Sequence, residues 1–180
     1  MTVKDLEVRE QRLRSLHADN YADLLRFVER RVPASEAEDV VSTVFLTAWR
    51  RLDDVPADPA GARPWLFAVA RRSMANQSRS WLRRQALDVR LAGHSTAEVP
   101  DGARGTAARV DLERAFRSLS VADREVLALI AFDGLTSDQA ATVLNCRRTT
   151  FAMRLARARQ RLRAALDDTP ATTSPVKDHV

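Results

Sequence analysis

The most telling chemistry in this chain lies in seven arginines between positions 147 and 163, a stretch without any acidic residue. A guanidinium group offers a planar fork of donors that suits phosphate oxygens and the edges of bases. Because like charges at neighbouring helical positions repel, such a run is costly unless an external polyanion neutralises it. The arginines therefore indicate a nucleic-acid surface, and an ordinary solvated helix face is the alternative. They are Arg147, Arg148, Arg154, Arg157, Arg159, Arg161 and Arg163.

Two short helical patterns must position these arginines. The first covers residues 137–144, a polar break covers 145–148, and the second pattern covers 149–166. Two helices with a polar turn, the second strongly cationic, form the helix-turn-helix layout, in which the second helix enters the major groove. We expect residues at the start of that helix to reach base edges and its later arginines to hold phosphates.

A second basic cluster, with aromatic residues between the arginines, covers residues 65–84. Aromatic rings and arginines on one helix suit unpaired bases, and each stacking contact is worth ~1–3 kcal/mol. The alternative is that the aromatic residues belong to a core, which we favour for Trp65. Trp81 lies among arginines far along the pattern, so we expect it at the surface. The cluster consists of Trp65, Phe67, Arg71, Arg72, Arg79, Trp81, Arg83 and Arg84.

Residue types that support catalysis or metal binding are sparse. His17, His94 and His179 are scattered, and the sequence holds no Cys/His metal spacing, glycine-rich phosphate loop or nucleophile motif. The single cysteine, Cys146, excludes an intrachain disulfide. Its simplest interpretation is a small buried hydrophobe, with a redox role as the alternative. We therefore expect no metal, no cofactor and no enzymatic activity.

The first half of the chain is predicted to be helical. Apolar residues recur at helical spacing over 21–32 and again over 40–52, with Ser35 as the predicted N-cap of the second stretch. Residues 53–62 contain two prolines and a glycine and are predicted to form a loop. Pro64 then suits the first turn of a third helix, which is expected to continue to about residue 84.

The composition changes between Gly93 and Ala108 to small and polar residues without apolar periodicity, which indicates a flexible linker. Regular structure is predicted to resume at Val110. Capping patterns at 120–123 and 136–139 begin two further helices, and residues 167–180 are predicted to be a flexible tail. Together these patterns predict an all-α fold of two small helical domains joined by a flexible linker.

Charge and composition restrict the setting in which the chain works. The net charge is +5, the sequence pI is near 10.5, and nearly all of the basic residues are arginine. Residues 1–11 are charged and lack the apolar segment of a signal peptide, and no apolar run approaches membrane-spanning length. We expect a soluble, cytoplasmic protein.

Four motifs occur in a fixed order along the chain. The first is Ala37-Glu38-Asp39-Val40-Val41-Ser42 with Phe45 and Trp49, and the second is Trp65-Leu66-Phe67-Ala68-Val69-Ala70-Arg71-Arg72. The third is Leu119 with Arg124-Glu125-Val126-Leu127, and the fourth is Thr150-Phe151 with Arg154-Leu155 and Arg157-Ala158-Arg159. Over residues 18–166 this series resembles bacterial RNA polymerase sigma factors of the extracytoplasmic-function (ECF) group. Several ordered motifs are far more specific than a lone helix-turn-helix.

The resemblance implies two domains, sigma region 2 at 18–88 and sigma region 4 with the helix-turn-helix at 110–166, joined by a linker at 89–109. It implies core RNA polymerase and promoter DNA as partners, and a role in promoter recognition and transcription initiation. An anti-sigma factor is compatible with the resemblance, and no membrane insertion is implied. The rival interpretation is a stand-alone helix-turn-helix regulator that binds duplex DNA without polymerase, and the first-half motifs argue against it.

The resemblance also assigns residues to three surfaces. Contacts to the clamp helices of the largest polymerase subunit fall on Glu38, Asp39, Val41, Ser42, Phe45 and Trp49. Contacts to the melted promoter strand fall on Arg71, Arg72, Asn76, Arg79, Trp81 and Arg83. Contacts to the upstream duplex fall on Gln139, Arg147, Arg148, Thr149, Thr150, Ala152, Met153, Arg154, Ala156 and Arg157. Within this last set, the family's base-reading positions are Ala152, Met153, Ala156 and Arg157.

Several residues depart from the family pattern. Ser42 and Thr43 replace a usual Gln-Glu pair, and Arg72 replaces a usual Asn. Arg147 stands where a capping Ser is common, so the second helix of the helix-turn-helix is predicted to lack a side-chain N-cap. Three of the four base-reading positions cannot form bidentate contacts with a base. Arg157, apolar contacts or DNA shape must therefore carry the specificity.

Overall fold

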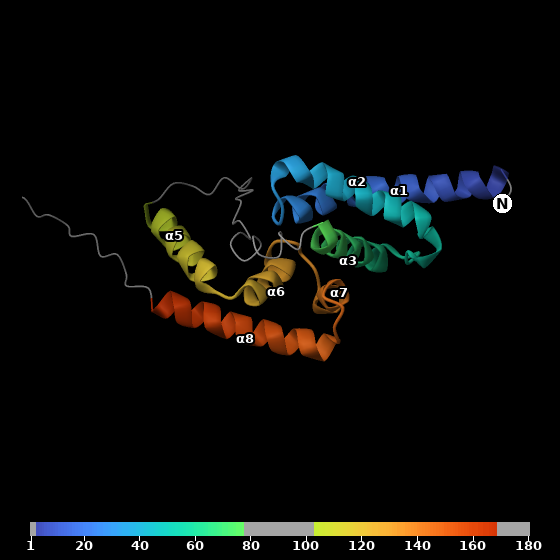
Figure 1. Ribbon diagram of the computed structural model, residues 1–180. Coiled ribbons are helices and arrows are strands. Elements are labelled where there is room, and N and C mark those ends of the chain that lie inside the picture. Colours follow the sequence, from blue (N-terminus) through green and yellow to red (C-terminus); the bar gives the residue numbers. More distant parts are fainter. Residues whose placement is uncertain (1–2, 78–102, 169–180) are drawn as a thin grey trace, which may run out of the picture.

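The computed structural model describes residues 3–77 and 103–168, and within these ranges it is helical and contains no strand, as the sequence predicts (Figure 1). The first half consists of α1 (Val3–Glu29), α2 (Ala34–Arg50), a 3₁₀ turn η1 (Leu52–Asp54) and α3 (Pro59–Gln77). The second half consists of α5 (Ala103–Ser118), α6 (Val121–Ala131), α7 (Ser137–Val143) and α8 (Arg148–Asp167). The predicted all-α architecture in two helical halves is confirmed.

The first three helices pack around a set of large buried side chains. Leu24 and Phe27 of α1, Val44 of α2, and Leu66 and Phe67 of α3 are fully buried. The rings of Phe27 and Phe67 stack with their centroids 4.4 Å apart. Aromatic stacking adds to the burial of apolar area, so this pair joins α1 firmly to α3.

The start of α2 differs from the prediction. The N-cap is Pro33, not Ser35, and no side chain caps this end of the helix. The Pro33 carbonyl instead accepts a hydrogen bond from the Glu36 amide at 2.9 Å. Pro33 has extended backbone angles that lead directly into the helix, so the helix begins before Ser35 and that residue lies within its first turn.

The third helix also begins earlier than predicted, at Pro59 inside the expected loop 53–62. Asp58 explains the early start, because its carboxylate accepts a hydrogen bond from the Gly61 amide at 2.8 Å and so caps the first turn. Pro59 is tolerated there because the first helical amide has no partner within the helix. Pro64, predicted to begin the helix, consequently lies inside it.

A proline inside a helix removes one donor from the backbone ladder. Pro64 cannot donate to the Ala60 carbonyl four residues earlier. That carbonyl instead accepts a hydrogen bond at 3.1 Å from Nε2 of Gln139, which belongs to α7 in the other half of the chain. The backbone group freed by the proline is thus satisfied across the boundary between the two halves.

Local capping fixes the helices of the second half. The Ser120 side chain accepts a hydrogen bond from the Asp123 amide at 3.1 Å, and Thr136 and Gln139 form a reciprocal capping box at the start of α7. Both caps confirm the predicted patterns. Residues 103–109, assigned to the linker, instead form the first turns of α5. Alanine and arginine are strong helix formers and dominate this stretch, which outweighs its single glycine.

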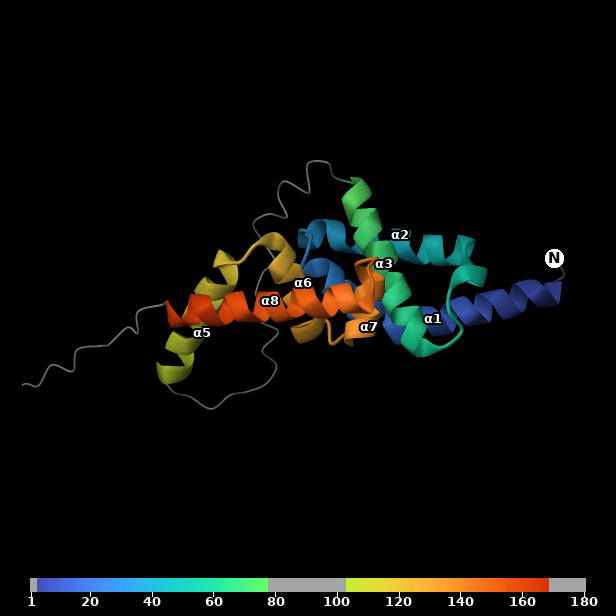
Figure 2. The ribbon, with the colours of Figure 1, turned by 90° about the horizontal axis from the view of Figure 1, so that it is seen from below.

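The long helix α8 lies across α5, α6 and α7, and Figure 2 shows it running the length of the second half. Its contact face consists of Phe151, Leu155 and Ala158, which are buried. Arg124 of α6 is buried nearby and donates to the carbonyls of Arg117 and Leu119 at 2.8 and 3.0 Å. These bonds satisfy acceptors at the C-terminal end of α5 and fix the turn into α6.

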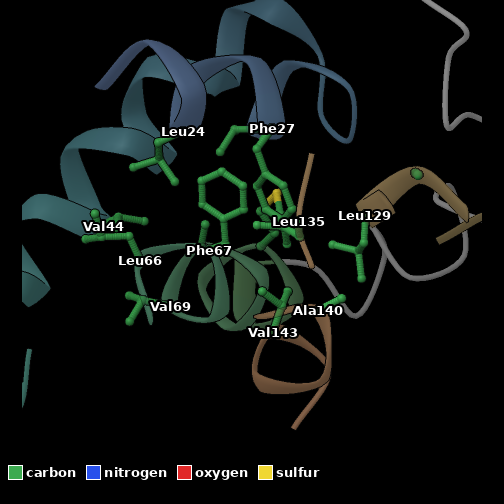
Figure 3. Packing of buried hydrophobic residues seen from close by; sticks show 14 of the residues in the cluster. Leu24, Phe27, Val44, Leu66, Phe67, Val69, Leu129, Leu135, Ala140 and Val143 are labelled. Carbon is green, nitrogen blue, oxygen red and sulfur yellow. The ribbon is translucent and has the colours of Figure 1, made fainter. Parts of the chain in front are cut away.

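The two halves share one hydrophobic core, whereas the sequence predicts two small domains joined by a flexible linker. Figure 3 shows Phe27 and Phe67 of the first half beside Leu135 of the second, and Leu66 and Ala140 belong to the same cluster. The principal contact between the halves runs along α3 and α7. The predicted domains therefore lie directly against each other.

A buried ion-pair cluster accompanies this apolar contact. Asp133, in the turn after α6, pairs with Arg30 and with Arg31, the latter at 2.8 Å, and neither Arg31 nor Asp133 has an exposed side-chain surface. Arg31 also pairs with Glu125 at 3.3 Å. Burial alone lowers the pKa of Arg31, but Glu125 and Asp133 outweigh it and raise that pKa above its ordinary value. Arg63 of α3 donates to the Asp133 carbonyl at 2.7 Å.

The capping assignments predict unequal effects of two serine substitutions. Ser120→Ala removes the acceptor of the Asp123 amide and is expected to lower the free energy of unfolding by ~1 kcal/mol. Ser35→Ala is the matched control and should change it by less than ~0.5 kcal/mol, because this exposed side chain caps nothing. Urea denaturation followed by circular dichroism measures both. Equal losses would restore Ser35 as a cap.

The salt bridges of Asp23 predict a pH-dependent contribution to stability. Partial burial raises the pKa of Asp23, but bonds and charge from Arg26 and Arg63 outweigh it, and the pKa lies below its ordinary value. A depressed carboxyl pKa stabilises the fold above the unfolded-state pKa, and the contribution is lost as the pH falls below about 4. Asp23→Asn should therefore lower the melting temperature at pH 7, and the difference should shrink near pH 3. Asp19→Asn, at an exposed site on the same helix, is the control.

Candidate nucleic-acid interface

The residues of α8 that pack into the core determine which of its other residues are exposed to solvent. Because Phe151, Leu155 and Ala158 pack into the core, the residues about half a turn away point to solvent. Met153 is 56% exposed, a large fraction for an apolar side chain. The exposed face contains the four predicted base-reading residues, Ala152, Met153, Ala156 and Arg157.

The turn before α8 leaves the start of this helix open. Asn145 adopts a positive φ of 50°, and the Cys146 amide donates to the Ala141 carbonyl at 3.0 Å, which closes α7. Cys146 is half-buried against the core, in agreement with its predicted role. Arg147 is the N-cap of α8 and forms no side-chain cap, as predicted. The first amides of a helix without such a cap suit a phosphate group.

The other predicted duplex contacts near the turn differ in their surroundings. Thr149 is exposed and Thr150 is half-buried. Arg148 pairs with Asp138 of α7 at 3.2 Å, and both side chains are largely exposed, so the pair is weak and open to exchange with a phosphate. Gln139 is occupied, because it caps α7 and donates to the Ala60 carbonyl.

A cleft of about 600 Å³ lies between α3, α6 and α8. Arg161 on its wall holds both carboxylate oxygens of Asp123 at 2.8 Å, so it braces α8 against α6. Arg157 and Arg154, one and two turns before Arg161 on α8, are exposed in the same cleft. The charged residues that line the cleft are Arg71, Asp123, Glu125, Arg154, Arg157 and Arg161.

The predicted melted-strand residues of α3 that the structure describes are exposed. Arg72 lies between two hollows, one of about 480 Å³ shared with Trp65 and the helix-turn-helix turn, and one of about 420 Å³ shared with Asn76. Arg71 lies 3.9 Å from Glu125 of α6. Trp65 is half-buried against the core, as favoured from the sequence. Arg79, Trp81 and Arg83 lie outside the described residues, as does Arg84.

The exposed face of α2 holds some of the predicted polymerase contacts. Glu38, Asp39 and Ser42 are exposed, and Trp49 is half-buried beneath the guanidinium of Arg9, which lies 5.7 Å from the ring centroid. These side chains are available to a partner. The exposed face of α2 is therefore acidic and polar, and its opposite face is embedded in the core.

Two of the predicted polymerase contacts occupy the core. Val41 is 1% exposed and Phe45 is 8% exposed, so both pack into the core, and only their neighbours on the outward face of α2 contact solvent. Sequence reasoning missed Leu46, which is 49% exposed on the opposite side of the helix. The available signal was its position four residues after Ser42, on the outward face of the helix.

Sequence reasoning also missed the acids that face the first half. Glu125 and Asp133 lie 94 and 102 residues from their partner Arg31. No local pattern reveals an ion pair over such a separation. The Asp133-Gly134 sequence marks a helix end, and Gly134 does adopt a positive φ of 63° there.

Within residues 3–77 and 103–168, no three His, Cys, Asp or Glu side chains gather in a way that would hold a metal ion. In the same part of the chain, no helix is long and apolar enough to span a membrane.

Comparison with known proteins identifies both halves. The model of sigma-70 region 2 matches residues 16–88, and the model of sigma-70 region 4 matches residues 109–162. The chain is 34% identical over 142 residues to the RNA polymerase sigma factor NccH of Alcaligenes xylosoxydans xylosoxydans, covering 75% of each protein. It is 30% identical to the ECF RNA polymerase sigma factor SigL of Mycobacterium tuberculosis, covering 89% of this chain and 92% of SigL.

A solved structure agrees with these relatives. The structure of CnrH in complex with the cytosolic domain of CnrY superposes with a TM-score of 0.57 at 28% identity, covering 87% of this chain and 89% of CnrH. Sigma factors are transcription initiation factors and are not enzymes. The two matched regions, in the same order as the two helical halves, show that this chain belongs to the sigma-70 family as an RNA polymerase sigma factor of the extracytoplasmic-function group.

Proposed function

We propose that this sigma factor uses three surfaces to start transcription. The outward face of α2 binds the clamp helices of the largest polymerase subunit, α3 holds the melted promoter strand, and α8 reads the upstream element as duplex. Residues 18–88 and 110–166 form the two functional domains, joined by residues between them. The chain has no catalytic activity of its own and works in the cytoplasm, where the polymerase is.

The observation that carries this proposal is the placement of α8. A helix whose inner face is fixed by Phe151 and Leu155 presents a strip of small and cationic residues to solvent, with an uncapped N-terminus at its start. A strip of small residues lets the helix backbone approach base pairs closely. Arg157 on that strip supplies a forked donor for a guanine, and the opening amides supply a phosphate site.

The melted-strand role of α3 is supported by exposed arginines next to hollows. Opening a duplex costs stacking, about 1.4 kcal/mol per base-pair step, so unpaired bases need compensating contacts. Arg72 and Asn76 line one hollow and Arg72 and Trp65 line another, so cationic, amide and aromatic groups are close together.

A protein inhibitor is a further proposed partner. CnrH, whose fold this chain shares, was solved with the cytosolic domain of CnrY bound to it. By analogy, we propose that an anti-sigma factor binds this chain as well. Its binding would compete with polymerase for the same exposed helices.

Leu46 provides a test of the polymerase surface. Exposed apolar residues at the centre of an interface often carry its binding energy, so Leu46→Ala should weaken core-polymerase binding about tenfold. Val8→Ala changes another exposed apolar residue, on α1, and should have no effect. Binding is measured by fluorescence anisotropy, and run-off transcription tests the function itself. Duplex binding by a chain that never activates core polymerase would favour the stand-alone regulator.

Arg157 provides a test of the upstream reading surface. Arg157→Ala is expected to reduce discrimination between promoter variants by ~1–3 kcal/mol, because a bidentate base contact is lost. Arg163→Ala, two turns further along α8, should weaken binding uniformly without changing discrimination, as loss of a phosphate contact does. Competition binding with a panel of upstream duplexes measures both quantities. Unchanged discrimination in the Arg157 variant would exclude it from base reading.

A further inference from the structure

We propose that Arg161, which is not among the predicted base-reading residues, is a positioning residue for upstream recognition: it neutralises Asp123 and thereby keeps the neighbouring Arg157 free for the promoter. The sequence predicts that the later arginines of α8 hold phosphates, whereas the structure gives this one a partner within the protein. The inference rests on the proposed function, since it assigns a role to one more residue of the same helix.

The ion pair between Arg161 and Asp123 joins α8 to α6 through a carboxylate with little access to water. The Asp123 side chain is 10% exposed, and Nη1 of Arg161 lies 2.8 Å from both of its carboxylate oxygens. The Ser120 hydroxyl donates to the same carboxylate at 2.6 Å. A charge with so little exposure is strongly destabilising once its partner is removed. Asp123 is therefore expected to take another cation when Arg161 is absent.

The other acid of the cleft between α3, α6 and α8 is engaged elsewhere. The carboxylate of Glu125 lies 3.3 Å from Arg31 and 3.9 Å from Arg71, and both arginines belong to the first half of the chain. Within the residues that the structure describes, Asp123 is thus the acid of this cleft that pairs with α8.

Arg157 is the arginine of this cleft that lies nearest to Arg161 along α8. The two residues are four positions apart, a separation that places side chains next to each other on one side of a helix. Helical side chains lean towards the N-terminus, so the surface that Arg161 covers lies over the turn that carries Arg157. Arg157 is exposed and forms no ion pair within residues 3–77 and 103–168, so it is available to an unpaired carboxylate.

Capture of Arg157 by Asp123 would remove the forked donor from the exposed face of α8. A bidentate contact with a guanine needs two guanidinium donors in a fixed direction, and a carboxylate binds the same donors in the same bidentate way. The two acceptors therefore compete for one side chain. Because Arg161 occupies Asp123, Arg157 remains directed to solvent, and Arg161 influences base reading without touching DNA itself.

Substitutions at the ion pair test the inference through discrimination between upstream duplexes, measured by competition binding. Arg161→Ala should lower discrimination about tenfold, as loss of a base contact does, because Asp123 then takes Arg157. Asp123→Asn added to this variant should restore discrimination to nearly the wild-type level, since a neutral amide does not hold a guanidinium by charge. Arg161→Lys keeps a positive charge beside Asp123 and should retain discrimination.

Two matched controls separate this effect from a general change of charge. Arg163→Ala removes an exposed arginine from the same helix and should leave discrimination unchanged. Asp111→Asn removes an acid from α5, where Asp111 pairs locally with Arg114, and should not restore the Arg161→Ala variant. Circular dichroism establishes that each variant is folded. The comparison of Arg161→Lys with Arg161→Ala decides the outcome if the Asp123 variant is not.

Thermal unfolding without DNA tests the exchange of partners directly. Arg157→Ala should leave the melting temperature of the otherwise wild-type chain unchanged, because Arg157 is unpaired there. In the Arg161→Ala background the same substitution should lower the melting temperature by ~1–3 °C, because it removes the new partly exposed ion pair with Asp123.

The inference is overturned if Arg161→Ala keeps wild-type discrimination, or if it weakens binding to every duplex equally, as loss of a phosphate contact does. It is also overturned if Asp123→Asn fails to reverse the loss, since the ion pair then only braces α8 against α6. If Arg157→Ala itself changes no discrimination, the base contact in the proposed function is wrong, whereas the melting temperatures still decide whether Asp123 takes Arg157.

Discussion

A carboxylate without any contact to solvent must be neutralised where it lies, and Asp133 is neutralised by two arginines from the far end of the sequence. This requirement connects the end of α1 to the turn between α6 and α7. Once that connection is made, α7 lies along α3, Leu135 and Ala140 enter the core of the first half, and the helix-turn-helix faces α3. The buried charge and the apolar surface around it together hold the two described halves against each other.

Arginine serves two purposes in this chain, and burial distinguishes them. Arg31 and Arg124 are buried and hold carboxylates or backbone carbonyls, so they build the fold. Arg72 and Arg157 are exposed beside hollows and remain available to a polyanion. Arg161 is intermediate, because its side chain is largely exposed and yet one of its nitrogens, Nη1, pairs with Asp123. The number of arginines in the sequence is therefore larger than the number that is available to bind DNA.

Features encoded within a few residues of one another were predictable from the sequence. The caps at Ser120 and Thr136, the missing cap at Arg147 and the helical periods all depend on local spacing, and the structure agrees with them. The starts of α2 and α3 were missed because proline backbone geometry and the Asp58 cap outweigh the patterns at Ser35 and Pro64.

Features that depend on distant partners were not predictable. The contact between the two halves depends on ion pairs between residues about a hundred positions apart, such as Arg30 and Asp133. The helix α2 was predicted from its apolar periodicity. Which of its residues point outward could not be predicted, because that depends on how α1 and α3 cover the helix. Val41 and Phe45 proved to be inside, and Leu46 outside, for that reason.

The proline inside α3 has a consequence for how tightly the halves can be joined. The acceptor at Ala60 is filled by an amide when α7 is present and by water when it is absent, so the exchange changes the free energy little. Its effect is on alignment: a sliding displacement of one helix along the other by a single residue would leave the two groups unmatched. The carbonyl freed by Pro64 thus fixes the position of α7 along α3 and adds little to the strength of the contact between the halves.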